Sequence, residues 1–192
     1  MEEISLIELI AKIKDGDAAV RAAAWQNTGR YGAAAVKPLA AVMTDENIEI
    51  ARAAKRGLWV LVRHVGRPGA EGEKKPVVAA LCGLLGNDQP AAVRREVLWM
   101  LSEIGGDEAV EAIRDIPGIE YNEELREDAR CALQRIPGNA AVETLWDALD
   151  VVPEKVKYAV AASLRARGMN VAGYPSQKLV PTKQTEVQPV QP

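Results

Sequence analysis

The sequence predicts an all-α fold: an α-solenoid (α-α superhelix) of about five stacked helical hairpins. Three observations favour it. The apolar residues are mostly Ala, Leu, Val and Ile with no Phe among 192 residues, and the abundance of Ala and Leu favours helices over sheets. One helical pattern recurs along the chain at a nearly constant period. No stretch alternates apolar and polar residues for long, as a half-buried strand would.

The recurring pattern marks the second helix of each predicted hairpin. It starts with an apolar and then a basic residue, at Val20-Arg21, Ala54-Lys55, Val93-Arg94, Leu125-Arg126 and Val156-Lys157. These starts are 34, 39, 32 and 31 residues apart, a period typical of helical-hairpin repeats. Twelve residues after each start comes a helix-stopping residue: Gly32, Gly66, Gly105, Pro137 and Gly168. Glycine stops a helix by adopting the left-handed conformation, and proline by lacking an N–H.

The hairpins are completed by shorter apolar first helices. The second helices are predicted at residues 20–32, 50–66, 93–105, 125–136 and 156–168, and the first helices at 3–14, 34–44, 75–86, 107–115 and 140–149. Polar turns such as Asp15-Gly16-Asp17 separate the partners, and their Asp and Asn side chains can cap the following helix. A single amphipathic hairpin cannot bury its apolar face, whereas stacked hairpins bury one another's faces.

Two segments carry a family resemblance: DGDAAVRAAAWQNTGRYGAAAVKPLAAVM and NDQPAAVRREVLWMLSEIGGDEAVEAI. They resemble HEAT repeats, and are similar to the short variety found in phycobilin lyases and in many bacterial proteins. The resemblance covers roughly residues 3–168 and implies HEAT-like hairpins whose second helices line a concave face. It does not imply one function, because this scaffold hosts many. In the fourth repeat, residues 119–124 lengthen the turn and Pro137 replaces the usual glycine, so irregular stacking is expected there.

Two domains are predicted: a HEAT-like repeat domain at residues 1–169 and a Pro- and Gln-containing extended tail at 170–192. The tail contains four prolines and lacks helical periodicity, which is typical of extended segments. A polar, Gly-rich loop is predicted at residues 66–75 and accounts for the longest repeat spacing, 39 residues.

Charge is segregated by helix type. The five predicted second helices carry 14 basic and four acidic residues, a balance of +10, and the rest of the chain carries −13. A concave face lined by these helices would attract an acidic partner surface. The candidate partner-binding residues are Arg21, Lys55, Arg56, Arg94, Arg95, Arg126, Arg130 and Lys157. The alternative is a stabilising ladder in which these cations pair with nearby acids, such as Asp17 with Arg21 and Glu154 with Lys157.

Tryptophans recur with the repeats: Trp25 and Trp59 share one repeat position, and Trp99 lies one residue further on. Such a row can stack on bases or anchor a peptide, but packing between repeats is favoured because tryptophan is usually well buried. Trp146 is expected to pack in the same way. The lone His64 and the separate Cys82 and Cys131 form no catalytic or metal-binding motif.

The sequence therefore predicts a non-catalytic protein–protein interaction scaffold or accessory subunit. It would bind an acidic partner surface through the concave face, the 66–75 loop and the C-terminal tail, without metal or cofactor. The alternative is a HEAT-like enzyme or a nucleic-acid- or pigment-binding protein, either bilin-lyase-like or DNA-glycosylase-like; the pI of about 5.4 argues against nucleic acid. The start MEEISLIELIAKIK is acidic and no apolar run spans a bilayer, which predicts a cytoplasmic protein without a membrane partner.

Overall fold

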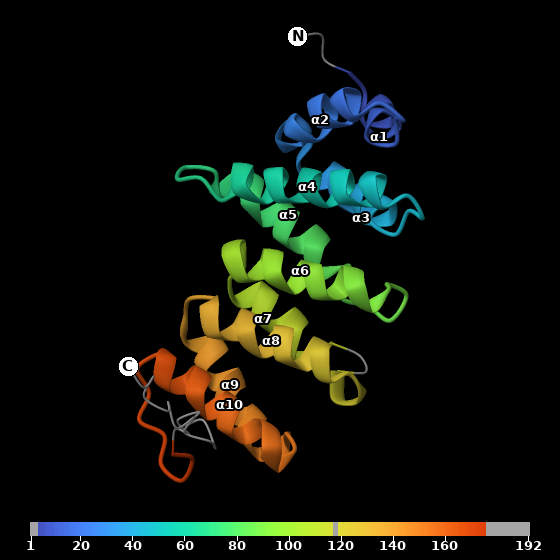
Figure 1. The fold of residues 1–192 in the computed structure, drawn as a ribbon. Helices are drawn as coiled ribbons and strands as arrows, with labels where there is room; N and C mark the ends of the chain where they lie inside the picture. Colours follow the sequence, from blue (N-terminus) through green and yellow to red (C-terminus); the bar gives the residue numbers. More distant parts are fainter. Residues whose placement is uncertain (1–3, 117–118, 176–192) are drawn as a thin grey trace, which may run out of the picture.

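The chain folds as a stack of five helical hairpins (Figure 1). The structure is a computed structural model and describes residues 4–116 and 119–175. The hairpins are α1 (Leu6–Ile13) with α2 (Ala18–Gln26), α3 (Val36–Val42) with α4 (Ile48–Val65), α5 (Glu71–Cys82) with α6 (Ala91–Ile104), α7 (Asp107–Arg114) with α8 (Glu123–Arg135), and α9 (Asn139–Val151) with α10 (Glu154–Ala166). Two 3-10 helices, η1 (Thr28–Ala35) and η2 (Ile119–Tyr121), lie between helices of the stack. The predicted α-solenoid is confirmed.

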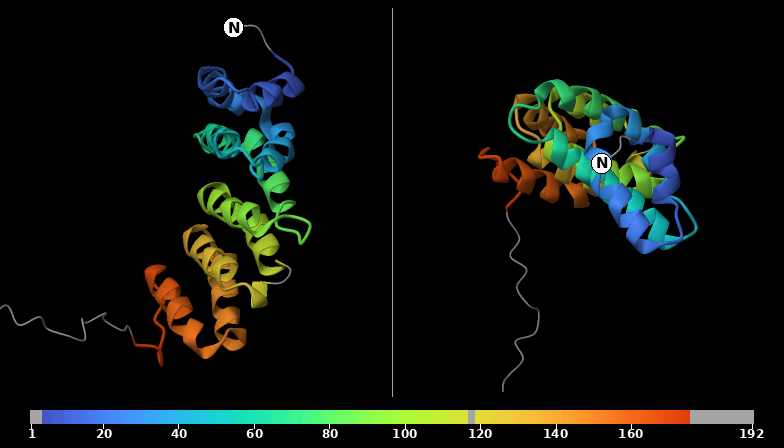
Figure 2. Two further views of the ribbon diagram at one scale, coloured as in Figure 1. Left: turned by 45° about the vertical axis from the view of Figure 1, so that its right-hand side comes forward. Right: turned by 90° about the horizontal axis from the view of Figure 1, so that it is seen from above.

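The stack is curved, and its second helices, α2, α4, α6, α8 and α10, lie on the inner side of the curve (Figure 2, left). A single apolar core runs through it from Leu9 in α1 to Leu164 in α10, with both side chains fully buried. Each hairpin thus covers the apolar face of its neighbour, as expected of stacked repeats.

Helix starts follow the predicted capping chemistry. The side chains of Ser5, Asp17, Asn47 and Asn122 each accept a hydrogen bond from a backbone N–H in the first turn of the following helix, which satisfies a donor that has no partner within the helix. At α6 and α10 a proline occupies the cap position instead.

The glycines that end the helices do not all act as predicted. Gly32 and Gly168 have positive φ angles of 55° and 84°, but Gly66 and Gly105 have φ angles of −78° and −70°, so the left-handed stop is wrong for those two. Gly105 is required for space: a Cβ there would lie 2.6 Å from the Leu101 carbonyl oxygen.

The second helix of the first hairpin is shorter than predicted. It ends at Gln26 rather than at residue 32, and the chain continues as η1. The buried Thr28 hydroxyl donates to the Gly57 carbonyl oxygen in α4 at 2.7 Å. This bond between hairpins holds the chain in η1, a tertiary effect that local sequence does not show.

The predicted 66–75 loop is half its expected length, because α5 begins at Glu71. Acidic residues in the first turn of α5 favour that start through the helix dipole. The shortened loop is closed by Glu73, which pairs with Arg67 at 2.6 Å and faces His64 at 3.3 Å. The bond from Arg67 lowers the pKa of the Glu73 carboxyl below its ordinary value.

The first six residues of the predicted tail pack against α10. Arg165 donates hydrogen bonds to the carbonyl oxygens of Val171, at 3.0 Å, and of Tyr174. The Tyr174 ring meets Tyr158 edge to face, with centroids 5.8 Å apart. The rest of the tail, 176–192, lies outside the described residues, so the boundary at 169 stays a prediction. None of the helices in the described ranges is long and apolar enough to cross a membrane.

Candidate functional site: a basic and aromatic cluster on α4

The inner surface of the second hairpin carries a hollow of about 430 Å³. We call its lining the α4 cluster, which consists of Trp25, Arg52, Lys55, Arg56, Trp59 and Arg63. All but Trp25 lie on α4 at helical spacing, so they share one face. The opposite face of α4 carries buried residues such as Leu58 and Leu61 and packs into the core. The amphipathic pattern of α4 therefore turns four cations toward solvent, and no acidic residue lines the hollow.

Two of the four cations have carboxylate partners. Arg52 pairs with Glu49 at 2.7 Å in the preceding turn. Lys55 pairs with Glu96 of α6 at 2.6 Å. The same Glu96 accepts a hydrogen bond from the Trp59 indole at 2.5 Å, so it fixes both a cation and an aromatic ring of the cluster.

The other two cations stack on tryptophan rings. The Arg56 guanidinium lies 5.9 Å from the centroid of the Trp25 ring, and Arg63 lies 5.8 Å from that of Trp59. Such cation–π contacts orient a guanidinium without neutralising its charge. Within the described residues neither arginine forms an ion pair with a carboxylate. Both are exposed, so both keep hydrogen-bond donors for an incoming anion.

The tryptophans are not the buried core that was predicted. Trp25 and Trp59 are half-buried and contact the core with one edge. Trp99 and Trp146 are 36% and 39% exposed. The predicted packing therefore holds in part for Trp25 and Trp59, which pack against the core, whereas Trp99 and Trp146 are more exposed than predicted.

The candidate cations of the later hairpins are engaged in contacts within the fold. Arg95 pairs with Asp128 of α8 at 2.5 Å and also with Glu124. These contacts hold the pKa of Arg95 above its ordinary value. Arg94 is buried, with 8% of its surface exposed, and Arg126 is half-buried beside α10.

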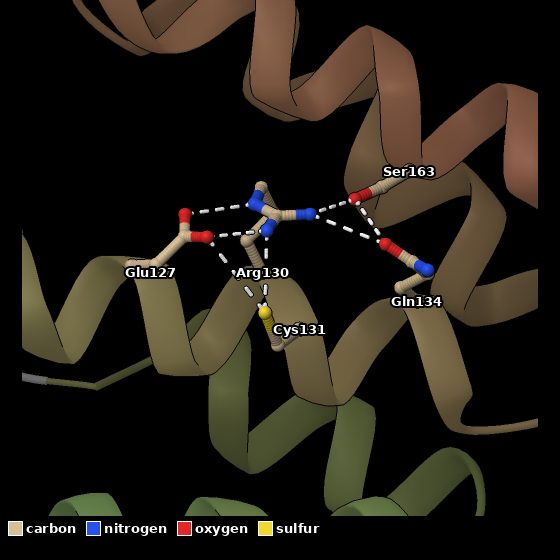
Figure 3. A network of polar contacts seen from close by, with 5 residues as sticks. All are labelled: Glu127, Arg130, Cys131, Gln134 and Ser163. Carbon is tan, nitrogen blue, oxygen red and sulfur yellow. Dashed lines mark hydrogen bonds and ion pairs between the residues drawn. The ribbon is translucent and has the colours of Figure 1, made fainter.

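Arg130 is the centre of a polar network between α8 and α10 (Figure 3). It donates to Glu127 at 2.8 Å, to Gln134 at 3.2 Å, and to Ser163 of α10. Hydrogen bonding to Arg130 lowers the pKa of the Glu127 carboxyl, while burial raises the pKa of the neighbouring Cys131 thiol. The network thus gives Arg130 a structural role, and its role in binding a partner stays a prediction.

Arg21 and Lys157, the first and last of the eight candidates, make contacts with residues close to them in the sequence. Arg21 donates to the carbonyl oxygens of Asp15 and Gly16 at 2.7 and 2.8 Å, instead of pairing with the Asp17 carboxylate. Lys157 pairs with Glu154 at 3.3 Å, as the ladder interpretation predicted.

Of the eight candidates, the structure brings only Lys55 and Arg56 into the α4 cluster. Sequence reasoning did not single out Arg52 and Arg63. Arg52 lies three, four and seven residues from Lys55, Arg56 and Trp59, and Arg63 lies eight, seven and four residues from them, which places both on the same helix face. Among the residues that the structure describes, no group of His, Cys, Asp and Glu could hold a metal ion.

Residues 78–165 match a family model described as HEAT repeats. This part of the chain is therefore similar to HEAT repeats. The match spans α6 to α9 with the end of α5 and most of α10, while the hairpins that carry the α4 cluster precede it. A search of curated proteins found no match.

Two solved structures with similar folds are engineered proteins. One is a crystal structure of an engineered protein from a structural genomics consortium, 22% identical, with a TM-score of 0.41, covering 85% of this chain and 79% of that one. The other is a designed armadillo repeat protein, 14% identical, with a TM-score of 0.29, covering 84% of this chain and 99% of that one. Neither indicates what this protein binds.

Proposed function

We propose that this protein is a non-catalytic scaffold that binds an acidic segment of a partner protein through its concave face, with the α4 cluster as the main contact. The observation that supports it is the state of Arg56 and Arg63. Both are exposed and held on tryptophan rings, and neither has a carboxylate partner within the described residues.

The chemistry of the cluster fits such a segment. Guanidinium groups bind carboxylates through two parallel, charge-assisted hydrogen bonds. The exposed edges of Trp25 and Trp59 offer apolar contact to the aliphatic parts of Asp and Glu side chains, and Trp and Arg are the residues that dominate binding energy at interfaces. The loop at 66–70 and the C-terminal tail remain secondary contacts of the proposal.

The test uses a fluorescein-labelled decamer of glutamate and the full chain, with binding followed by fluorescence anisotropy. The double variant Arg56→Glu, Arg63→Glu is expected to weaken binding at least tenfold, which corresponds to about 1.4 kcal/mol. Raising the salt concentration should weaken wild-type binding, because exposed charges are screened.

The matched control is Lys37→Glu, Lys75→Glu, which changes the net charge equally at exposed sites on first helices. It should change the affinity less than twofold. Equal losses in both double variants would mean that only the overall charge matters, and the proposed site would be wrong. Tight binding of a thymidine decamer, lost in the Arg56/Arg63 variant while the glutamate peptide binds to neither protein, would favour the nucleic-acid alternative instead.

A further inference from the structure

A second hollow of about 460 Å³ lies at the other end of the solenoid, between the fourth and fifth hairpins. Its lining comes from the end of α7, η2, α8, the last turns of α9, and the start of α10. It therefore lies at the edge of the stack where the turns within the hairpins are found, away from the α4 cluster. Its walls are mainly apolar, with Ile113, Ile119, Leu145, Val152 and Val160 among them.

The hollow results from unequal helix lengths. α7 has 8 residues, whereas α9, which occupies the same position in the next hairpin, has 13. The sequence explains the short helix, since Pro117 follows shortly after its end and proline disfavours the helical conformation of the residue before it. Within the described residues no helix covers the last turn of α9, and Val151 is 81% exposed there.

The polar groups that line the hollow are mostly cationic. Arg114, Arg126 and Arg130 lie along it, and Asp147 is the one acidic residue in its lining. Two of the arginines are held in place: Arg114 donates to the Thr144 hydroxyl at 3.1 Å, and Arg130 belongs to the α8–α10 network (Figure 3). Arg130 uses its N–H groups within that network and is paired with Glu127, whereas Arg114 keeps further N–H donors for another acceptor.

We infer that this hollow is a binding site for a small amphipathic carboxylate, with its hydrocarbon part against the apolar walls and its carboxylate facing the arginines. The volume falls in the range of small-molecule pockets, roughly 300–1,000 Å³, which are typically apolar with a few placed polar groups. Methylene groups that the apolar walls remove from water add to the affinity for such a ligand. Because Glu127 pairs with Arg130, the head group would meet Arg114 and Arg126 beside the single aspartate, Asp147, and this excess of positive charge selects an anion, as electrostatic complementarity requires.

The probe is decanoate, titrated into the full chain by isothermal titration calorimetry beside decyltrimethylammonium, which has the same hydrocarbon chain and the opposite charge. Decanoate is expected to bind with one site per chain and at least tenfold more tightly than the cation. Equal affinities would show nonspecific apolar adsorption, and absence of decanoate binding would also overturn the inference.

Three variants locate the site. Ala148→Phe fills the hollow from α9 and should weaken decanoate binding at least tenfold, whereas Ala80→Phe, an equal change at a half-buried position of α5 outside this hollow, should leave it unchanged. Val151→Trp also fills the hollow, and the exposure of Val151 makes this change compatible with folding. Arg126→Gln should weaken decanoate binding about fivefold and leave the binding of decyltrimethylammonium unchanged.

Two results would assign the hollow differently. Unchanged decanoate binding in both filled variants would place the ligand elsewhere. Tighter decanoate binding in the full chain carrying Leu179→Ser and Val180→Ser would show that the C-terminal segment of the chain itself occupies the hollow. Either result overturns the inference and leaves the proposal for the α4 cluster intact, because the two sites share no residue.

Discussion

The two halves of the solenoid use their arginines differently. In the second hairpin, Arg56 and Arg63 rest on tryptophan rings and face solvent. In the third to fifth hairpins the inner cations bridge consecutive second helices: Arg95 to Asp128, Arg135 to Glu103 and Lys155 to Glu123. The same residue type is available for binding in one half and holds repeats together in the other.

The difference follows from where the acids are. α2 has no acidic residue, and α4 has only Glu49, at its first turn. α6 and α8 carry Glu96, Glu103 and Asp128, each of which meets a cation of a neighbouring second helix. A basic helix face therefore indicates a binding surface only where the acids of the adjacent second helices do not reach its cations: Glu96 of α6 pairs with Lys55, whereas Arg56 and Arg63 lie on tryptophan rings.

The largest effect is expected at Asp128. Asp128→Ala should lower the free energy of unfolding by about 2 kcal/mol, because it removes the buried partner of Arg95 and leaves a half-buried charge without its closest acceptor. Glu49→Ala, which removes the exposed partner of Arg52, should cost less than about 0.5 kcal/mol. Urea denaturation followed by circular dichroism measures both values. Equal losses of unfolding free energy in the two variants would contradict the difference between the half of the solenoid whose cations bridge second helices and the half whose cations face solvent.

The stability of the first two hairpins should instead depend on the close approach of the backbone at Gly29 to α4. A Cβ at Gly29 would lie 2.8 Å from His64 Cγ in α4, so Gly29→Ala is expected to cost about 1–2 kcal/mol through overpacking. The matched control is Gly16→Ala, since a Cβ there would meet no atom within 4 Å. Thermal unfolding of the two variants tests this prediction, and a destabilisation by the control as large as that of Gly29→Ala would refute it.

Neutralising the cluster should affect stability little. The variant Arg56→Gln is expected to lower the free energy of unfolding by less than about 1 kcal/mol, because an exposed cation–π contact contributes about 0.5–1 kcal/mol. Arg95→Gln should cost more, since Asp128 then remains buried without its cation. Urea denaturation should show the larger loss of unfolding free energy for Arg95→Gln. The reverse order would mean that the α4 cluster stabilises the fold.

The smallest expected effect concerns the pKa of the Glu127 carboxyl and how its contact with Arg130 depends on pH. Arg130 holds the pKa of the Glu127 carboxyl below its ordinary value of 4.5, so this contact stabilises the fold above that pH and its contribution is lost as the pH falls through the folded-state pKa. NMR titration of the carboxyl should show the lowered pKa in the wild type and a rise toward 4.5 in Arg130→Gln. A wild-type value at or above 4.5 would contradict the network in Figure 3.

The candidate site could be predicted in part. The segregation of basic residues onto the second helices pointed to the inner side of the stack, where Lys55 and Arg56 line the α4 cluster. Arg94, Arg95 and Arg130 looked equivalent to them in the sequence, yet they are buried or bridged to residues 29 to 33 positions away. Sequence patterns at helical spacing cannot identify such partners, because the register between hairpins decides which side chains meet.

The sequence by itself determined the all-α class, the five hairpins, the capped helix starts and the basic character of the second helices, because these depend on residues within one or two helical turns of each other. The tertiary structure alone decided which cations stay available, why Thr28 draws the chain into η1, and that the short α7 leaves a hollow beside α9. Each of these depends on how one hairpin rests on the next, which is set by packing across the stack.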